Sequence, residues 1–299
     1  MLESILVGAV AGGTCMVYAG LGEVCTERSG VINLGTEGSM LCGALAAYAV
    51  GITTGNPWLG VLAGLLAGAA LSSVHALLVL ERGANQIASG LVVTFLGLGI
   101  TALFGQNYVG QGVIPLETWD IPGLSQLPFL GPILFQHDPL TYLAFAAIPL
   151  TSWVLWRTRA GLVLRAAGEA PEVLEIYGTS ARKVRWMTIL VGGAMSGLGG
   201  AQLSTAATLN WSEGMTVGRG FVAVALVIFA GWKPLNLALG AYLFAGAIAL
   251  QLQLQARGWE VSRYLLEALP YLLVLVILAL LSRRRIHGGP ATLERVFDH

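Results

Sequence analysis

Charged side chains are scarce in this sequence. Aspartate, glutamate, lysine and arginine supply 11% of the 299 residues, whereas a soluble domain has about 25%. The sixteen basic and sixteen acidic residues cancel, so no net charge attracts nucleic acid or an acidic substrate. Because 56% of the residues are hydrophobic, the chain is predicted to be an integral membrane protein.

Lysine and cysteine are rarer still. Neither of the two lysines, Lys183 and Lys233, follows a glycine, so the chain has no phosphate-binding GxxxxGK[ST] loop and cannot hydrolyse ATP by that route. The cysteines Cys15, Cys25 and Cys42 show no CxxC spacing, which argues against a disulfide framework and a zinc site. No basic segment with a small-residue cleavage pattern precedes the first apolar run, which is therefore predicted to be a retained span.

Apolar stretches, by contrast, fill most of the chain. A membrane-spanning helix needs about 20 mostly apolar residues, and nine stretches approach that length. They cover 4–22, 33–51, 58–80, 86–105, 139–156, 184–207, 217–231, 235–255 and 264–282. The second and seventh begin in glycine-rich, charged sequence, and a re-entrant segment in place of one would leave eight spans. The sequence predicts one transmembrane domain over 1–299, a polytopic all-α bundle of eight or nine spans with discontinuous helices.

Positive charges predict the orientation. The connection 105–138 contains no lysine or arginine and is expected outside the cell, whereas the connection 157–185 and the C-terminal tail are basic and are expected in the cytoplasm. Their basic residues are Arg157, Arg159, Arg165, Arg182, Lys183, Arg185, Arg283, Arg284, Arg285 and Arg295. Nine crossings then place the N-terminus outside and the C-terminus inside, with Arg257 and Arg263 in an outer loop as a small violation.

One polar stretch interrupts the apolar runs. Glu27–Gly38 reads ERSGVINLGTEG. A polar group that lacks a hydrogen-bond partner in hydrocarbon destabilises the protein by several kcal/mol. Such backbone persists at membrane depth only where protein or a water-filled cavity surrounds it. The stretch is predicted to begin a discontinuous helix that lines a translocation path. An ordinary cytoplasmic turn between two spans is the alternative, and periodicity does not separate the two.

A second stretch of this kind is Trp211–Gly220, reading WSEGMTVGRG, where glycines bracket Glu213 and Arg219 ahead of an apolar run. LAGAAL at Leu66–Leu71 and FAGAIAL at Phe244–Leu250 add a further echo, since each follows a proline. Weak internal symmetry is typical of transporters built from structural repeats. Alanine-glycine runs also recur by chance in any helical bundle.

The polar segments supply the candidate path residues. If the two glycine-rich heads face each other, an ion pair between Glu37 and Arg219 would offset the cost of burying either charge. The alternative is that each contacts lipid headgroups or backbone. The candidate set is Asn33, Gly35, Glu37, Gly38, Asn85, Gln86, Met215 and Arg219.

A short helix is predicted from Ala170 to Tyr177 in the connection 157–185. Pro171 suits a first helical turn, acids lie near the positive end of the helix, and Gly178 suits its C-terminal cap. The apolar face, too short to span a membrane, consists of Val173, Leu174 and Tyr177. This face either lies on lipid headgroups or inserts into a groove on a cytoplasmic partner.

Signals for an intramembrane enzyme or an ion-driven carrier are weak. His75 lies near Ser72 and Ser73, but its predicted span has no carboxylate to orient an imidazole and no GxSxG turn. We therefore expect a packing or hydrogen-bonded histidine. Acids cluster at the starts of spans, which disfavours a stand-alone secondary transporter without excluding it.

Five blocks of the sequence resemble the permease subunits of ATP-binding cassette importers of the branched-chain amino acid and simple-sugar group. In family order they are Glu27–Gly38, Ala84–Gly90 (ANQIASG), Arg165–Glu172 (RAAGEAPE), Gly192–Ala201 (GGAMSGLGGA) and Glu213–Trp232. The likeness is greatest to the shorter permease of nucleoside importers that use a basic-membrane-protein-type lipoprotein. Thr36 and Ser39 depart from the usual pattern, and the segment before Glu23 is short, which leaves the exact substrate open.

This resemblance implies an importer permease fold that works by alternating access. The implied partners are a second, longer permease in a heterodimer, a cytoplasmic ATPase that binds ATP and Mg, and an extracytoplasmic lipoprotein. The short helix would be the coupling helix, docking through Gly168, Glu169, Pro171, Val173, Leu174, Tyr177 and Gly178. The chain itself would be a multi-pass protein of the bacterial cell membrane, without a cofactor and not an enzyme. A simple sugar, riboflavin or another small ligand is the alternative to a nucleoside.

Overall fold

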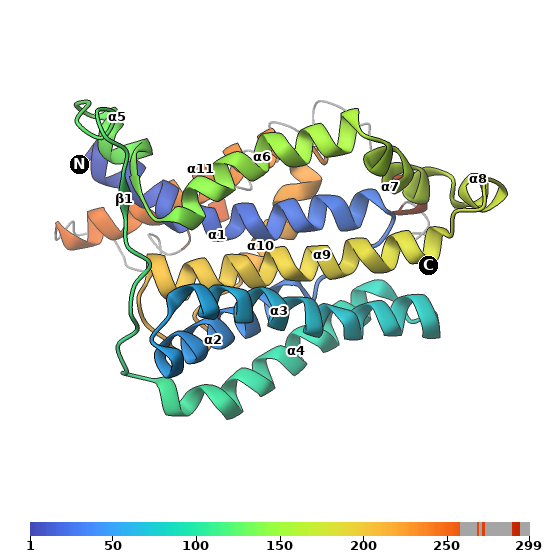
Figure 1. The fold of residues 1–299 in the computed structure, drawn as a ribbon, viewed down its shortest axis with the longest axis horizontal. Helices are drawn as coiled ribbons and strands as arrows, with labels where there is room; N and C mark the ends of the chain where they lie inside the picture. The colour runs from blue at the N-terminus through green and yellow to red at the C-terminus, as the bar shows by residue number, and fades with distance from the viewer. Residues whose placement is uncertain (258–267, 269–270, 273–288, 294–299) are drawn as a thin grey trace.

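The structure is a computed structural model that describes residues 1–257, 268, 271–272 and 289–293. Most of these residues form helices packed roughly along one long axis (Figure 1). The predicted span 264–282 lies almost entirely outside the described residues, as do Arg263, Arg295 and the arginines at 283–285.

Within the described residues, five helical segments are long and apolar enough to cross a membrane. They are α1 (Leu2–Arg28), α3 (Pro57–Ala76) continued by the π-helix η1 (Leu77–Glu81), α4 (Gln86–Gly105) continued by the 3-10 helix η2 (Gln106–Tyr108), α6 (Pro139–Arg157) and α11 (Pro234–Ala256). Three more helices lie among them: α2 (Thr36–Thr54), α9 (Ala181–Gln202) and α10 (Arg219–Phe229). The expected total of eight or nine spans stays a prediction.

Caps and prolines explain where several of these helices begin. The Asn56 side chain accepts a hydrogen bond from the N–H of Trp58 at 2.9 Å, and Pro57 is the first residue of α3. Asp138 caps α6 in the same way ahead of Pro139. Such a cap satisfies an N–H that the helix leaves unpaired, and a first-turn proline has no N–H to satisfy. The sequence located both helix starts closely from the length of the apolar stretches, and these caps are the physical reason for the boundaries.

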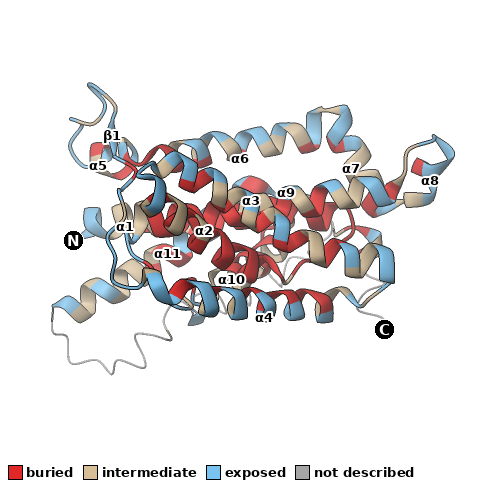
Figure 2. Ribbon diagram, turned by 60° about the horizontal axis from the view of Figure 1, so that its bottom comes forward, coloured by how far each residue is buried: buried red, intermediate tan, exposed pale blue. Residues whose placement is uncertain are grey.

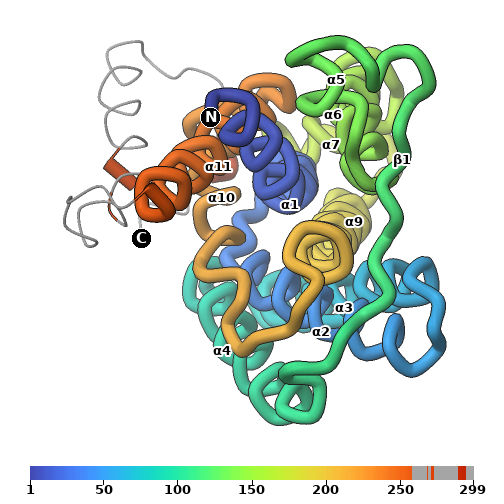
Figure 3. The backbone as a smooth tube through the Cα atoms, turned by 90° about the vertical axis from the view of Figure 1, so that its left-hand side faces the viewer, coloured from blue at the N-terminus to red at the C-terminus, as the bar shows by residue number. Residues whose placement is uncertain are grey.

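Helices α1 and α9 form the centre of the bundle. Seen along the long axis, they lie side by side, with α2, α3 and α4 on one side and α11 on the other (Figure 3). They carry much of the buried surface in Figure 2. Gly197 of α9 packs against Gly43, Gly64 and Gly68, and a methyl group on Gly197 would meet backbone atoms. Small residues allow this close approach, which compensates for the weak hydrophobic drive between helices in lipid.

The bundle has two halves, one that begins with α1 and one that begins with α9, and the first helix of each half packs against helices of the other half. Helix α1 packs mainly against α9 and α11, while α9 packs mainly against α3, α1 and α2. In each half a long helix is followed by broken backbone, then by a helix that starts inside the bundle, then by a helix that starts with proline. Because α1 and α9 run in opposite directions (Figure 1), this order fits inverted structural repeats. LAGAAL and FAGAIAL fall in α3 and α11, which hold corresponding places.

The remaining elements gather at the two ends of the bundle (Figure 1). One end holds the start of α1 and the connection 105–138, which contains β1 (Trp119–Asp120), α5 (Leu130–Leu134) and β2 (Gln136–His137), with β1 and β2 antiparallel. The other end holds α7 (Arg159–Glu169), α8 (Pro171–Ile176) and residues 289–293. The π-helix η3 (Leu203–Ala207) follows the last residue of α9. The connections 105–138 and 157–185, predicted on opposite sides of the membrane, thus lie at opposite ends of the protein.

Candidate translocation path and docking helix

The backbone between α1 and α2 is broken inside the protein. Helix α1 ends at Arg28 and α2 begins at Thr36, and residues 29–33 between them are buried. Gly30 has a φ of 93°, a conformation that favours glycine. Buried backbone outside a helix needs hydrogen-bond partners from elsewhere. Protein surrounds this stretch, as a discontinuous helix requires, while the alternative of a cytoplasmic turn between two spans stays open.

Glu23 of α1 accepts hydrogen bonds from the broken backbone segment and from the start of α2. Its carboxylate accepts hydrogen bonds from the N–H of Asn33 at 2.7 Å and from the hydroxyl of Thr36 at 3.3 Å. Glu23 is buried, and a buried N–H left without a partner costs about 1–3 kcal/mol. The sequence interpretation stressed Glu27 and passed over Glu23. The available signal was an acid one helical turn earlier in the same apolar run.

Side chains from α3 and α4 form hydrogen bonds with the backbone N–H and carbonyl oxygen of Ile32, the residue before Asn33. The amide oxygen of Gln86 accepts a hydrogen bond from the N–H of Ile32 at 2.8 Å. The imidazole Nε2 of His75 lies 3.1 Å from the carbonyl oxygen of Ile32, and its Nδ1 lies 3.1 Å from the Ser89 hydroxyl. His75 is thus a hydrogen-bonded packing residue, as predicted, and it supports the same break as Gln86.

Several predicted path residues hold backbone in place. The Asn33 side-chain oxygen accepts a hydrogen bond from the N–H of Gly35 at 2.9 Å. Gly38 lies so close to α4 that a methyl group there would come within 2.8 Å of the Thr94 Cα. Asn85 caps the N-terminus of α4 with its side chain. These residues build the rigid wall of the break.

The second glycine-rich stretch meets the first one at Glu37. Residues 208–218 are not helical, and α10 begins after them. The Glu37 carboxylate accepts hydrogen bonds from the Thr216 hydroxyl at 2.6 Å, from the N–H of Gly218 at 2.9 Å and from the N–H of Gly220 at 2.6 Å. The first N–H groups of a helix lack partners within it, and the helix dipole favours a negative charge there. Glu37, in the first turn of α2, therefore caps the N-terminus of α10.

The predicted ion pair between Glu37 and Arg219 is wrong, although the two stretches do meet. Arg219 donates to the carbonyl oxygen of Met215 at 3.0 Å, while three other donors occupy the oxygens of Glu37. Among the residues that the structure describes, the only ion pair joins Arg182 and Glu81. The oriented N–H groups at the start of α10 stabilise the Glu37 charge, so it needs no cation.

Arg219 still has hydrogen-bonding capacity. Its side chain is half-buried, and within the described chain its Nε has no hydrogen-bond partner. Met215 beside it is buried, whereas Val217 is exposed. The Nε atom itself is buried, so in this conformation other molecules do not reach it.

The ends of α1 and α10 are joined by a cluster of aromatic and charged side chains. The indole Nε1 of Trp232 donates to the Glu27 carboxylate at 2.5 Å. The Arg28 guanidinium lies 5.3 Å from the centre of the Trp156 ring and 5.7 Å from that of Trp232. Cation–π contacts and this hydrogen bond let charged groups lie within the protein at the end of the bundle that holds α7 and α8.

The predicted short helix is confirmed as α8, with Pro171 at its first position and Gly178, at φ 75°, just beyond its end. Its predicted apolar face is partly wrong. Leu174 is buried against the bundle, whereas Ile176 and Tyr177 are 83% and 81% exposed and Val173 is 46% exposed. The sequence placed Leu174 on the outer face because a six-residue helix has too few turns for periodicity to separate its faces.

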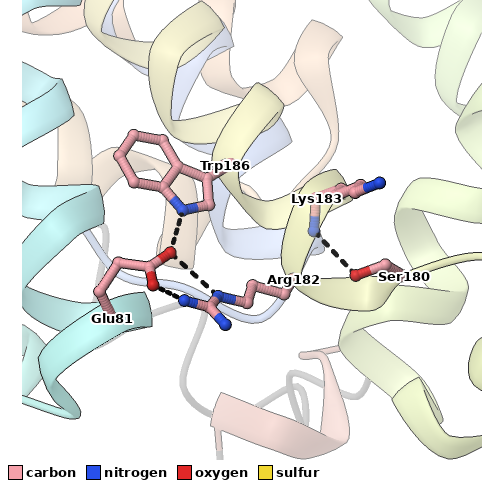
Figure 4. Close-up of polar contacts among 5 residues, drawn as sticks. All are labelled: Glu81, Ser180, Arg182, Lys183 and Trp186. Carbon is pink, nitrogen blue, oxygen red and sulfur yellow. Dashed lines mark hydrogen bonds and ion pairs between the residues drawn. The ribbon is translucent and has the colours of Figure 1, made fainter.

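The start of α9 is fastened to the π-helix η1 by Glu81, the last residue of η1. Its carboxylate forms an ion pair with Arg182 and accepts hydrogen bonds from the Arg182 Nε at 3.0 Å and the Trp186 Nε1 at 2.9 Å (Figure 4). The Ser180 hydroxyl accepts from the N–H of Lys183, which caps α9 (Figure 4). Helix α8 is therefore followed, within a few residues, by an anchored helix that crosses the centre of the bundle.

A cavity of about 600 Å³ lies between α2, α3 and α4. Its wall is mostly apolar, including Cys42, Leu71 and Phe104, with Asn107 and Tyr108 among its polar members. The predicted path residues do not line it. The cavity and the meeting of the broken helices are separate features.

A comparison with protein families identifies the chain. Residues 5–281 match the family of branched-chain amino acid transport system permease components. The chain belongs to this family. The permease is therefore a transport component and not an enzyme, since the ATPase of such systems is a separate subunit. The family also implies a substrate-binding protein as a partner and a multi-pass location in the plasma membrane.

Three relatives illustrate the range of the family around this permease. A putative glucose ABC transporter permease protein of Haloferax volcanii is 43% identical over 84% of this chain and 78% of its own. The nucleoside ABC transporter permease protein NupC of Lactococcus lactis is 31% identical over 95% of this chain and 94% of its own. The guanosine ABC transporter permease protein NupQ of Bacillus subtilis is 34% identical over 77% and 76%. No solved structure matches the permease.

Proposed function

We propose that this permease imports nucleosides by alternating access, driven by a separate ATPase. The observation that carries the proposal is the meeting of two interrupted helices at Glu37. The ends of broken helices expose polar backbone groups inside an apolar bundle. Transporters use such groups to bind polar solutes at membrane depth. The relatives named for nucleosides and guanosine support the substrate class, and the first of them aligns with 95% of this chain.

The path that we propose runs past the head of α10. Arg219 is its ligand-contacting residue, because its half-buried guanidinium can donate to a carbonyl or hydroxyl group and its planar face can stack on a base. The residues that fix the walls are Asn33, Gly35, Glu37, Gly38, Asn85, Gln86 and Met215. A neutral solute held by few contacts also leaves readily, as transport requires.

Helix α8 is the element that we propose as the docking site of the ATPase. Its exposed Val173, Ile176 and Tyr177 make a compact apolar face of the kind that inserts into a groove on a partner. Gly168, Glu169, Pro171 and Gly178 set the attachment of the helix, and Leu174 joins it to the bundle. ATP and Mg bind in the partner, whose closure then pulls on α8.

The sidedness follows from the charges. We place the end with α7 and α8 in the cytoplasm, since Arg157, Arg159 and Lys183 lie in that region, and the connection 105–138 outside. The N-terminus is then outside and the C-terminus inside. A lipoprotein receptor delivers the solute to the outer end, and a longer sister permease completes the pathway as a heterodimer.

A sugar is the second candidate substrate, because the putative glucose permease is 43% identical to this chain. Copurification of the permease with its membrane partners, followed by ATPase assays with guanosine, other nucleosides and glucose, distinguishes the two. We expect nucleosides to stimulate hydrolysis, whereas stimulation by glucose alone would replace the nucleoside proposal. Uphill uptake by the permease alone in liposomes, without nucleotide, would overturn the ATP-driven mechanism in favour of a secondary transporter.

A further inference from the structure

The segment 289–293 lies against the joint between α7 and α8. The Thr292 hydroxyl donates to the carbonyl oxygen of Gly168 at 2.7 Å, and the N–H of Ala291 donates to the Glu169 carboxylate at 3.3 Å. Gly168 and Glu169 are the last two residues of α7. The last carbonyl groups of a helix have no partner within it. Thr292 therefore caps α7 from a position 124 residues away in the sequence.

Buried side chains anchor this segment. Leu293 is only 4% exposed and belongs to the main hydrophobic core, together with Trp232. Pro290 is buried as well, and a methyl group on Gly289 would come within 2.8 Å of the Trp232 ring. The segment is thus packed into the end of the bundle and does not lie loosely on its surface.

The end of α7 is also held from two other directions. Arg185 of α9 donates to the carbonyl oxygens of Ser29 at 3.0 Å and Ala167 at 2.8 Å. Gly168 itself packs against the backbone of α1, and a methyl group there would also meet Pro290 at 3.1 Å. The joint before α8 is consequently fixed by α1, by α9 and by the segment 289–293.

We propose that the segment 289–293 is a strap that orients α8, with Thr292 as a positioning residue. The inference rests on the proposed docking role of α8. Helix α8 has six residues and starts just after Ala170, and so short a helix does not hold its own shape or direction. Its direction is set by the joint at Gly168 and Glu169 together with the buried Leu174. A pull on α8 therefore also reaches the ends of α1 and α10 through the strap.

Amide hydrogen exchange on the full-length permease in lipid nanodiscs tests the strap itself. Thr292→Val keeps the side-chain shape and removes the hydroxyl, and Leu293→Ala weakens the buried anchor. We expect exchange at residues 168–178 to rise about fivefold in Thr292→Val, the effect of losing one ordinary hydrogen bond on a local opening equilibrium. Thr292→Ser retains the hydroxyl and should match the wild type, while unchanged exchange in α3 shows that the fold is intact. Wild-type exchange at 168–178 in both Thr292→Val and Leu293→Ala would overturn the strap.

The positioning role needs a second readout, which is the amount of solute transported per ATP hydrolysed by the assembled importer. We expect this ratio to fall in Thr292→Val and to recover in Thr292→Ser. Faster exchange with an unchanged ratio would reduce the strap to a purely structural contact and overturn the positioning role. If the wild-type permease binds no ATPase, the proposed function fails, whereas the exchange result still decides whether the strap holds the joint.

Discussion

The Glu37 carboxylate accepts a hydrogen bond from the backbone N–H of Gly220 at 2.6 Å. This contact joins the starts of α2 and α10, two helices that both begin inside the bundle. It lets an acid at the start of one interrupted helix cap the start of another that lies far away in the sequence. The start of α10 therefore depends on a side chain of α2.

Glu37→Gln should destabilise the protein, because an amide supplies one acceptor oxygen in place of two and turns an N–H₂ group toward helix N–H donors. The expected loss is about 1–3 kcal/mol, measured as a lower melting temperature of the purified permease. Arg219→Gln should have its own, smaller effect on stability. Since the two residues form no ion pair, removal of Arg219 should not offset the loss at Glu37 in the double variant. A double variant more stable than Glu37→Gln alone would contradict the structure.

Glu23→Leu should destabilise the break between α1 and α2. Glu23 accepts from the N–H of Asn33 at 2.7 Å, and leucine leaves this buried N–H without an acceptor at a cost of about 1–3 kcal/mol. Thermal unfolding and faster amide exchange at residues 31–36 would report the loss. Glu3→Leu is the matched control, since Glu3 lies exposed in the same helix and should change neither quantity.

Substitutions on the two sides of α8 should separate docking of the ATPase from stability of the fold. Tyr177→Ala should leave the melting temperature unchanged, because Tyr177 is 81% exposed, yet it should reduce copurification of the ATPase. Leu174→Ala should instead lower stability by about 2–5 kcal/mol through the cavity it leaves. Full ATPase binding and full transport by Tyr177→Ala, or by Ile176→Ser, would indicate that the exposed face lies on lipid headgroups.

Gly197→Ala should disrupt the contact between α9 and α3. An added methyl group would lie 3.0 Å from the Gly68 Cα and closer still to the Gly64 carbonyl oxygen, and overpacking of this kind costs about 1–3 kcal/mol. Gly99→Ala is the control, because nothing lies within 4 Å of the added atom and alanine favours a helix. We expect melting temperatures to fall in the first variant and to stay or rise in the second.

Local signals explain what the sequence predicted well. Pro171 lies at the first position of α8 and Gly178 follows the helix, as predicted. Each signal concerns the conformation of neighbouring residues, which a sequence states directly. The same applies to the glycine-rich stretch at Gly30, whose broken backbone lies where it was expected.

Partners across the bundle were beyond the sequence. The expectation that Glu37 pairs with Arg219 matched charge to charge, but Glu37 is bound by N–H groups that every residue carries and no pattern marks. Glu23 was missed for a related reason, because its hydrogen bond to the N–H of Asn33 forms only once the chain after α1 has turned back toward that helix. Leu174 was assigned to the wrong side because only tertiary packing decides which residue of so short a helix turns inward.

The exchange of α1 and α9 between the two halves sets an order for biosynthesis. Helix α3 finds its main neighbour in α9, and α2 packs against α9 next after α3. The ribosome makes α9 only after the whole connection 105–138 and helices α6 to α8. The first helices must therefore wait in the lipid, already inserted but incompletely assembled, until residue 202 has been added. A chaperone or a protease in the membrane would meet that waiting state during every round of synthesis.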